Sequence, residues 1–136
     1  MWKRILSNEN MVAIRKDFGF WLSRIINYPL VSPDVIQVPL TSRCNLRCKM
    51  CSIHTKENGE LSKREIFDII RQASAMGIRE AVLTGGEPFL RRDLFEICDY
   101  CKAEGIRSIV TTNGTMITEE IAKKIVDSGL SHLHFS

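Results

Sequence analysis

Three cysteines, Cys44, Cys48 and Cys51, lie within eight residues of one another. Their C-x3-C-x2-C spacing offers one metal centre three thiolates, one short of the four protein ligands that a structural zinc site or a [4Fe–4S] cluster normally takes. A cluster held by three thiolates leaves one iron open, and an open metal position is where a substrate or cosubstrate binds. The spacing therefore indicates a reactive iron–sulfur cluster rather than a structural staple.

Zinc is the alternative occupant of this loop. His54 follows Cys51 by three residues and could complete a Cys3His site. Zinc sites, however, usually join two pairs of ligands across a longer span of chain, whereas these four candidates fall within eleven residues. Arg43, Arg47 and Lys49 alternate with the cysteines, and their charge would stabilise thiolates and an anionic cluster. The spacing favours the cluster, and a zinc-binding interaction domain is the second hypothesis.

Two further segments with chemistry-bearing side chains follow predicted strands. Gly85-Gly86-Glu87-Pro88 comes after a strand at about 79–84. Its glycines allow the backbone to approach a ligand closely, and Glu87 could accept hydrogen bonds from an ammonium group. Thr111-Thr112-Asn113-Gly114 ends the next strand. Its hydroxyls and amide could bond a ribose or a carboxylate, although an Asn-Gly turn accounts for this tetrapeptide equally well.

Alternating strand and helix patterns occupy the chain from residue 35 onward. Units of this length require parallel strands joined by right-handed crossovers, and the chemistry of such sheets gathers at the carboxyl ends of the strands. The cysteine loop and the segments that end the other strands should therefore form one site at one rim. The predicted strands cover 35–41, about 79–84, about 106–112 and a segment from about 130, which ends at Phe135-Ser136; the predicted helices begin at Ser62, Asp93 and Thr118.

An apolar stripe at helical spacing marks residues 1–34 as an amphipathic helical extension, which Pro29 and Pro33 separate from the main domain at 35–136. The favoured interpretation is a helix packed on the surface of the main domain. The alternative is an interfacial helix that docks on a membrane, because basic residues accompany Trp and Phe. The stripe consists of Met11, Ile14, Phe18, Trp21, Leu22 and Ile25.

The bulk composition narrows the classes of function. With 136 residues the chain is long enough for one domain, and its net charge of +3 is too small to indicate a nucleic-acid partner. The chain has neither an apolar run of membrane-spanning length nor a secretory signal. Five cysteines, three of them in one loop, fit metal ligation in a reducing compartment, so we expect a cytoplasmic protein. Cys98 and Cys101 share a helical stripe with Leu94 and Ile97 and should be core residues.

Taken together, these motifs resemble the radical S-adenosylmethionine superfamily over about residues 35–136. The resemblance implies an α/β fold in which the strand–helix repeats form the first four units of a partial (β/α)6 TIM-like barrel. It also implies a [4Fe–4S] cluster whose open iron chelates the amino and carboxylate groups of S-adenosylmethionine. The implied reaction is reductive cleavage to a 5′-deoxyadenosyl radical that abstracts hydrogen from a substrate. The matching residues are Cys44, Cys48 and Cys51, the GGEP motif Gly85 to Pro88, and Thr112 with Asn113.

The resemblance assigns roles to individual positions. Met50 fills the position beside the third cysteine that meets the adenine, where the family usually has an aromatic residue, and an adaptable methionine can pack there. Gly85, Gly86 and Glu87 match the stretch that meets the methionine amino group. Thr112 and Ser136 match strand-end positions that bond the carboxylate or the ribose.

The run from Thr84 to Asp93 is similar to the branch that contains the molybdenum-cofactor cyclase and the SPASM-domain enzymes. The cyclase usually has a basic residue where this chain has Val82, which argues against a triphosphate substrate. The resemblance implies a small-molecule or peptide substrate and a reducing partner such as flavodoxin or ferredoxin. Because the last strand has no covering helix after it, we expect the front part of a longer protein. A third hypothesis is therefore a fragment that binds a cluster without turnover, since its open cavity would admit water.

Overall fold

The computed structural model describes residues 8–28, 30–53 and 59–136. The chain divides into two compact units, Met1–Pro33 and Asp34–Ser136, and each unit is described by itself.

The first unit contains helix α1, Asn8–Ile26, so the predicted N-terminal helix is present. Phe18 and Trp21 stack with their ring centroids 5.8 Å apart, and both side chains are more than half exposed. The helix ends where Asn27 takes a positive φ of 53°. No described helix is long and apolar enough to cross a membrane. Packing of α1 on the main domain and docking of α1 on a lipid surface both stay predictions.

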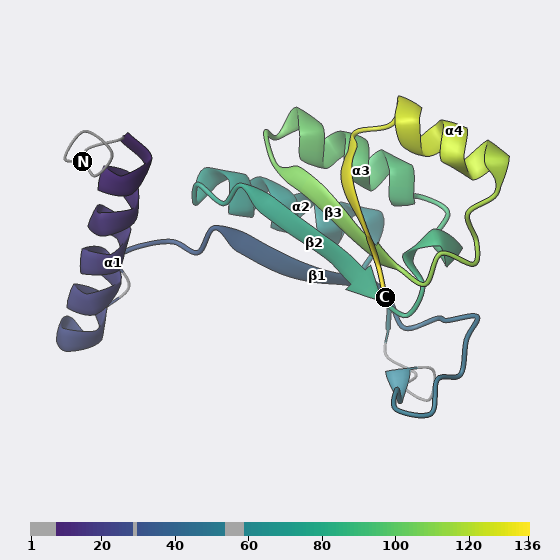
Figure 1. Cartoon of the computed structure of the whole chain (residues 1–136), viewed down its shortest axis with the longest axis horizontal. Coiled ribbons are helices and arrows are strands. Elements are labelled where there is room, and N and C mark those ends of the chain that lie inside the picture. Colours follow the sequence, from purple (N-terminus) through teal and green to yellow (C-terminus); the bar gives the residue numbers. More distant parts are fainter. Residues whose placement is uncertain (1–7, 29, 54–58) are drawn as a thin grey trace, which may run out of the picture. The chain divides into compact units, whose positions relative to one another are not determined.

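The second unit is a parallel sheet of four strands in the order β1-β2-β3-β4, with a helical segment between successive strands. Figure 1 shows the strands side by side in chain order, from blue β1 to yellow β4. The predicted strand–helix repeats are confirmed, and the short 3-10 helix η3 is an addition that the sequence did not reveal. The strands are β1 (Val35–Thr41), β2 (Glu80–Gly85), β3 (Arg107–Thr112) and β4 (Leu130–Phe135); the helices are α2 (Lys63–Ala75), η3 (Pro88–Leu90), α3 (Leu94–Ala103) and α4 (Glu119–Asp127).

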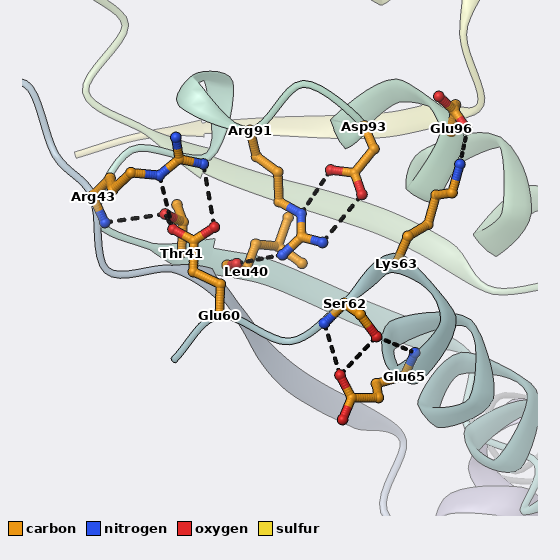
Figure 2. Close-up of polar contacts among 10 residues, drawn as sticks. All are labelled: Leu40, Thr41, Arg43, Glu60, Ser62, Lys63, Glu65, Arg91, Asp93 and Glu96. Atoms are coloured by element: carbon orange, nitrogen blue, oxygen red, sulfur yellow. Dashed lines mark hydrogen bonds and ion pairs between the residues drawn. The ribbon is translucent and has the colours of Figure 1, made fainter. Parts of the chain in front are cut away.

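Local capping explains where two of the helices begin. Helix α2 starts at the predicted capping box, in which the Ser62 hydroxyl accepts a hydrogen bond from the Glu65 N–H and the Glu65 carboxylate accepts one from the Ser62 N–H at 2.8 Å (Figure 2). Helix α4 starts at Thr118, whose hydroxyl accepts a hydrogen bond from a backbone N–H in the first turn. Helix α3 begins after Asp93 without a side-chain cap, because that carboxylate binds Arg91 instead.

The hydrophobic core lies between the sheet and helices α2 and α3. Cys98 and Cys101 are fully buried in it, and burial raises the pKa of each thiol to about 12. Both cysteines are therefore inert core residues, as their helical spacing predicted. The buried apolar residues are Val38, Leu40, Ile66, Ile70, Ala73, Ile78, Ala81, Leu83, Leu94, Ile97, Cys98, Cys101, Ile106 and Val110.

The opposite face of the sheet carries the alternate side chains and is more open. Pro39, His132 and His134 are exposed, whereas Val82 and Ile109 are half-buried. Most parallel sheets are covered on both faces. Within the described part of Asp34–Ser136, the packed apolar core lies on the face that α2 and α3 cover.

A buried arginine fixes the end of β1. The β1–β2 register passes from Pro39↔Thr84 to Thr41↔Gly85, so β1 carries one extra residue, Leu40, at this bulge. The Arg91 guanidinium, 7% exposed, donates to the Leu40 carbonyl at 2.7 Å and to the two Asp93 carboxylate oxygens at 2.7 and 3.1 Å (Figure 2). The bulge directly precedes the cysteine loop, so Arg91 stabilises the backbone from which that loop starts.

We expect Arg91→Ala to lower the free energy of unfolding by about 3 kcal/mol, because it removes one partner of a largely buried ion pair and leaves the Leu40 carbonyl unsatisfied. Urea unfolding followed by circular dichroism measures the change. The matched control is Arg71→Ala, which removes an exposed pair with Asp68 that solvent screens, and which should leave the midpoint unchanged. Equal midpoints for the two variants would contradict this account of Arg91.

The same ion pair predicts a dependence of stability on pH. The Arg91 guanidinium holds the pKa of Asp93 below its usual range. A lowered folded-state pKa contributes stability that is present above the ordinary carboxyl pKa of about 4 and is lost as the pH falls through the folded value. Asp93→Asn should therefore flatten the fall in unfolding free energy below about pH 4. Urea titrations at a series of acidic pH values measure it, and parallel curves for the two proteins would refute the assignment.

Candidate functional site

The C-terminal ends of the four parallel strands lie side by side at one end of the sheet, which we call the strand edge or rim. Thr41 of β1 pairs with Gly85 of β2, and Thr112 of β3 pairs with Phe135 of β4. The Ser136 N–H then donates to the Thr112 carbonyl at 3.1 Å and carries the pairing one residue further. The cysteine loop leaves the sheet at the same edge, where the arrowheads end in Figure 1. The predicted convergence of these segments is therefore confirmed.

The two glycines of the GGEP motif lie directly against the root of the cysteine loop. The Gly86 N–H donates to the Thr41 carbonyl at 2.7 Å, and the Glu87 N–H donates to the Arg43 carbonyl at 2.8 Å. A Cβ atom on Gly85 would lie 2.2 Å from the Thr41 oxygen, and one on Gly86 would lie 2.0 Å from the Arg43 oxygen. Gly85 also has a φ of +132°, which side chains disfavour. The sequence suggested glycines that let a ligand approach, and the structure shows that they let the cysteine loop approach.

The Glu87 carboxylate joins the end of β2 to the end of β3. The residue is fully buried, and its carboxylate accepts hydrogen bonds from the Thr112 hydroxyl at 2.8 Å, the Asn113 N–H at 2.9 Å and the Phe89 N–H at 3.1 Å. A buried carboxylate is tolerated when such donors satisfy it. In this structure Glu87 positions the β3 end, and its predicted contact with an ammonium group stays a prediction.

A second set of contacts joins the cysteine loop to the segment after β3. The Asn113 side-chain amide donates to the Asn45 Oδ1 at 2.9 Å, and the Asn45 amide donates to the Thr115 Oγ1 at 2.8 Å. The Thr115 hydroxyl and N–H both donate to the Asn113 Oδ1, at 2.6 and 2.9 Å. Sequence analysis missed Asn45 and Thr115. A polar side chain inside the cysteine loop was the available signal, and its partners are about 70 residues away.

The two stems of the cysteine loop are tied together by Glu60. Its carboxylate accepts a hydrogen bond from the Thr41 hydroxyl and two from the Arg43 guanidinium, at 2.8 and 3.2 Å (Figure 2). Arg43, followed by Thr41, lowers the pKa of Glu60 below its usual range. Sequence analysis did not identify Glu60 either, because an isolated glutamate before a helix carries no recognisable signal.

The cysteines themselves lie on the outer part of this loop. Cys44 is half-buried and accepts a hydrogen bond from the Leu46 N–H on Sγ at 3.4 Å. Cys48 and Cys51 are exposed and close a turn in which the Cys51 N–H donates to the Cys48 carbonyl at 3.1 Å. Within the described ranges, no group of three or more His, Cys, Asp or Glu residues is placed to hold a metal ion. The structure thus puts the three thiols on one loop but does not converge them, and His54 lies outside the described residues.

The donor set nevertheless suits an iron–sulfur cluster. All three thiols are free, and soft thiolates are the ligands that iron–sulfur clusters take. Met50, between the second and third cysteines, is 98% exposed. An apolar side chain so placed is available to pack against a ligand.

Comparison with known proteins identifies the family. Residues 38–136 match the sequence model of the Radical SAM superfamily. The GTP 3',8-cyclase of Nautilia profundicola is 39% identical over 109 residues, which are 76% of this chain and 34% of that protein. The Fe-coproporphyrin III synthase of Methanosarcina barkeri is 34% identical over 117 residues, which are 84% of this chain and 29% of that protein. The chain thus spans about a third of the length of these relatives.

Solved structures show the same fold. BtrN in complex with AdoMet and 2-DOIA superposes with a TM-score of 0.66 at 24% identity over 74% of this chain and 44% of that chain. SuiB of Streptococcus suis bound to the precursor peptide SuiA superposes with a TM-score of 0.67 at 22% identity over 93% of this chain and 29% of that chain. The predicted class, strand–helix units of a TIM-like barrel, is confirmed.

Members of this superfamily bind a [4Fe–4S] cluster and S-adenosylmethionine. The family match covers most of the chain and includes all four strand ends and the cysteine loop. This chain therefore belongs to the Radical SAM superfamily of enzymes.

Proposed function

We propose that this chain is the cluster- and nucleotide-binding part of an enzyme that reductively cleaves S-adenosylmethionine to a 5′-deoxyadenosyl radical for hydrogen abstraction. The observation that carries the proposal is the backbone pairing of Gly86 and Glu87 with Thr41 and Arg43. This pairing places a loop with three free thiols beside the GGEP segment, at the strand edge where ligands bind in parallel α/β folds.

In this proposal Cys44, Cys48 and Cys51 hold the cluster and leave one iron for S-adenosylmethionine. The exposure of Cys48 and Cys51 supports it, because side chains free of packing can turn toward a common metal centre when the cluster binds. Arg47 and Lys49 lie on the same loop, and their positive charge would attract an anionic cluster.

The nucleotide would lie along the strand edge. Exposed Met50 would cover the adenine, and the Gly85–Gly86 backbone would face the methionine amino group. Ser136 and Asn113 directly follow β4 and β3 and would bond the ribose or the carboxylate, Asn113 through the second N–H of the amide that bonds to Asn45. Thr112 and Glu87 are buried and bonded to each other, which holds the strand ends in place, and their contacts with S-adenosylmethionine stay predictions.

The substrate would lie against the open face of the sheet. A row of side chains crosses this face in register from Gln37 through Val82 and Ile109 to His132. The radical would form at the C-terminal ends of the strands, which a second row on the same face, Pro39 with Thr84 and Thr111 with His134, separates from this one. A small molecule or a peptide is compatible with the row, which contains no Asp, Glu, Lys or Arg.

The remaining partners follow from the chemistry. Reductive cleavage requires an electron, which we assign to a reducing protein such as flavodoxin or ferredoxin. We place the protein in the cytoplasm, because five free cysteines suit a reducing compartment.

Anaerobic reconstitution with iron and sulfide tests the ligand assignment. The unchanged chain and the control Cys101→Ala, which alters a buried thiol in the core, should both acquire a full cluster, as iron content and visible absorption report. Cys48→Ala should lose it, because two thiolates cannot replace three. After reduction, added S-adenosylmethionine should yield 5′-deoxyadenosine. Zinc uptake without iron, or a full cluster in Cys48→Ala, would refute the proposal. A cluster without the nucleoside would limit this chain to binding.

The contact between the glycines and the loop gives a further prediction. Gly86→Ala should reduce cluster occupancy several-fold, because its Cβ would lie 2.0 Å from the Arg43 carbonyl oxygen and would push the loop root away. Gly59→Ala is the control, since its Cβ would meet nothing within 4 Å. Iron content after identical reconstitution of both variants is the measurement. Full occupancy in Gly86→Ala would show that the contact does not govern the loop.

A further inference from the structure

Asn45 follows the first cysteine and links it to a distant part of the chain. Its side-chain amide accepts a hydrogen bond from Asn113, 68 residues away, and donates one to Thr115, 70 residues away. The Thr115 hydroxyl returns a hydrogen bond to Asn113 at 2.6 Å, so the three side chains form a closed ring of donors and acceptors. Asn45 and Thr115 are exposed and Asn113 is half-buried, so water competes for each single hydrogen bond, but the closed ring limits the arrangements that the three side chains share.

The ring restrains Cys44 more than the other two cysteines. On one side of Cys44, the Arg43 carbonyl accepts a hydrogen bond from the Glu87 N–H. On the other side, Asn45 is held by the ring. Cys48 and Cys51 lie further out on the exposed part of the loop. The first cysteine is therefore fixed relative to the strand edge, whereas the second and third are freer to adjust.

The ring also continues into the GGEP segment. The Glu87 carboxylate accepts a hydrogen bond from the Asn113 N–H at 2.9 Å, and the Asn113 side chain bonds to Asn45. An unbroken series of hydrogen bonds therefore runs from the buried Glu87 to the residue beside Cys44. A movement of Asn45 would therefore strain the hydrogen bonds of Glu87, and a movement of Glu87 would strain those of Asn45.

We propose that Asn45, Asn113 and Thr115 form a clasp that positions Cys44, and with it the cluster, relative to the GGEP segment. Asn45 and Thr115 are positioning residues, because they act through the loop and not on the reacting atoms. The inference rests on the proposed function, because it concerns the contacts that S-adenosylmethionine, once bound to the cluster, makes with the C-terminal ends of the strands. The clasp sets the affinity for S-adenosylmethionine and leaves the capacity for iron unchanged.

The test uses the full chain with Asn45→Ala, Thr115→Val, the double variant, and Thr115→Ser as the matched control that retains the hydroxyl. In the reconstituted proteins, iron content should stay at the level of the unchanged chain in all variants. The affinity for S-adenosylmethionine, followed by its effect on the paramagnetic resonance spectrum of the reduced cluster, should fall about fivefold in Asn45→Ala and in Thr115→Val. The double variant should lose little more than either single one, because both remove the same ring, and Thr115→Ser should retain the original affinity.

A second experiment measures hydrogen exchange and needs no metal. In the cluster-free chain, Asn45→Ala should speed amide hydrogen exchange at residues 113–115, although the substitution is about 70 residues away. Unchanged exchange there, or unchanged affinity for S-adenosylmethionine in Asn45→Ala with full iron content, would overturn the clasp. Failure of the proposed function is distinguishable, because the unchanged chain would then take up no iron while the exchange arm would still decide whether the clasp exists.

Discussion

The site depends on the close backbone contact between the GGEP segment and the root of the cysteine loop. Two hydrogen bonds, from Gly86 and Glu87 to the carbonyls of Thr41 and Arg43, continue the β1–β2 pairing beyond the sheet. A side chain at either glycine would collide with carbonyl oxygens of the loop. This contact fixes the position of the backbone from which the cysteine loop starts. The other interactions of the rim are arranged around it.

Polar groups buried near this contact make the rim rigid. Arg91 satisfies the Leu40 carbonyl at the bulge of β1, and Glu87 receives three hydrogen bonds that tie β2 to β3. Breaking such a network is costly, because each buried partner would be left without water or a donor. The thiols of Cys48 and Cys51, in contrast, are exposed. A rigid edge with adaptable ligands suits a loop that must close around an inorganic cluster.

The two faces of the sheet also differ, because one is packed against helices and the other is more open. Within Asp34–Ser136, helices α2 and α3 cover one face with a continuous apolar core, whereas the other face is more open. In a TIM-like barrel the corresponding face turns inward. The chain spans about a third of its curated relatives, and it contains the strand edge and the cysteine loop together. The face against which we propose that the substrate lies is therefore the more open of the two.

Sequence alone determined the features that depend on neighbouring residues. The strands, the Ser62–Glu65 capping box, the core positions of Cys98 and Cys101 and the motifs at the strand ends all follow from local spacing. Tertiary structure decided which groups meet across the rim. The Asn45 ring and the Arg91 bond to Leu40 join residues 50 or more positions apart. Their partners depend on strand register and on the path of the loop, which no local pattern encodes.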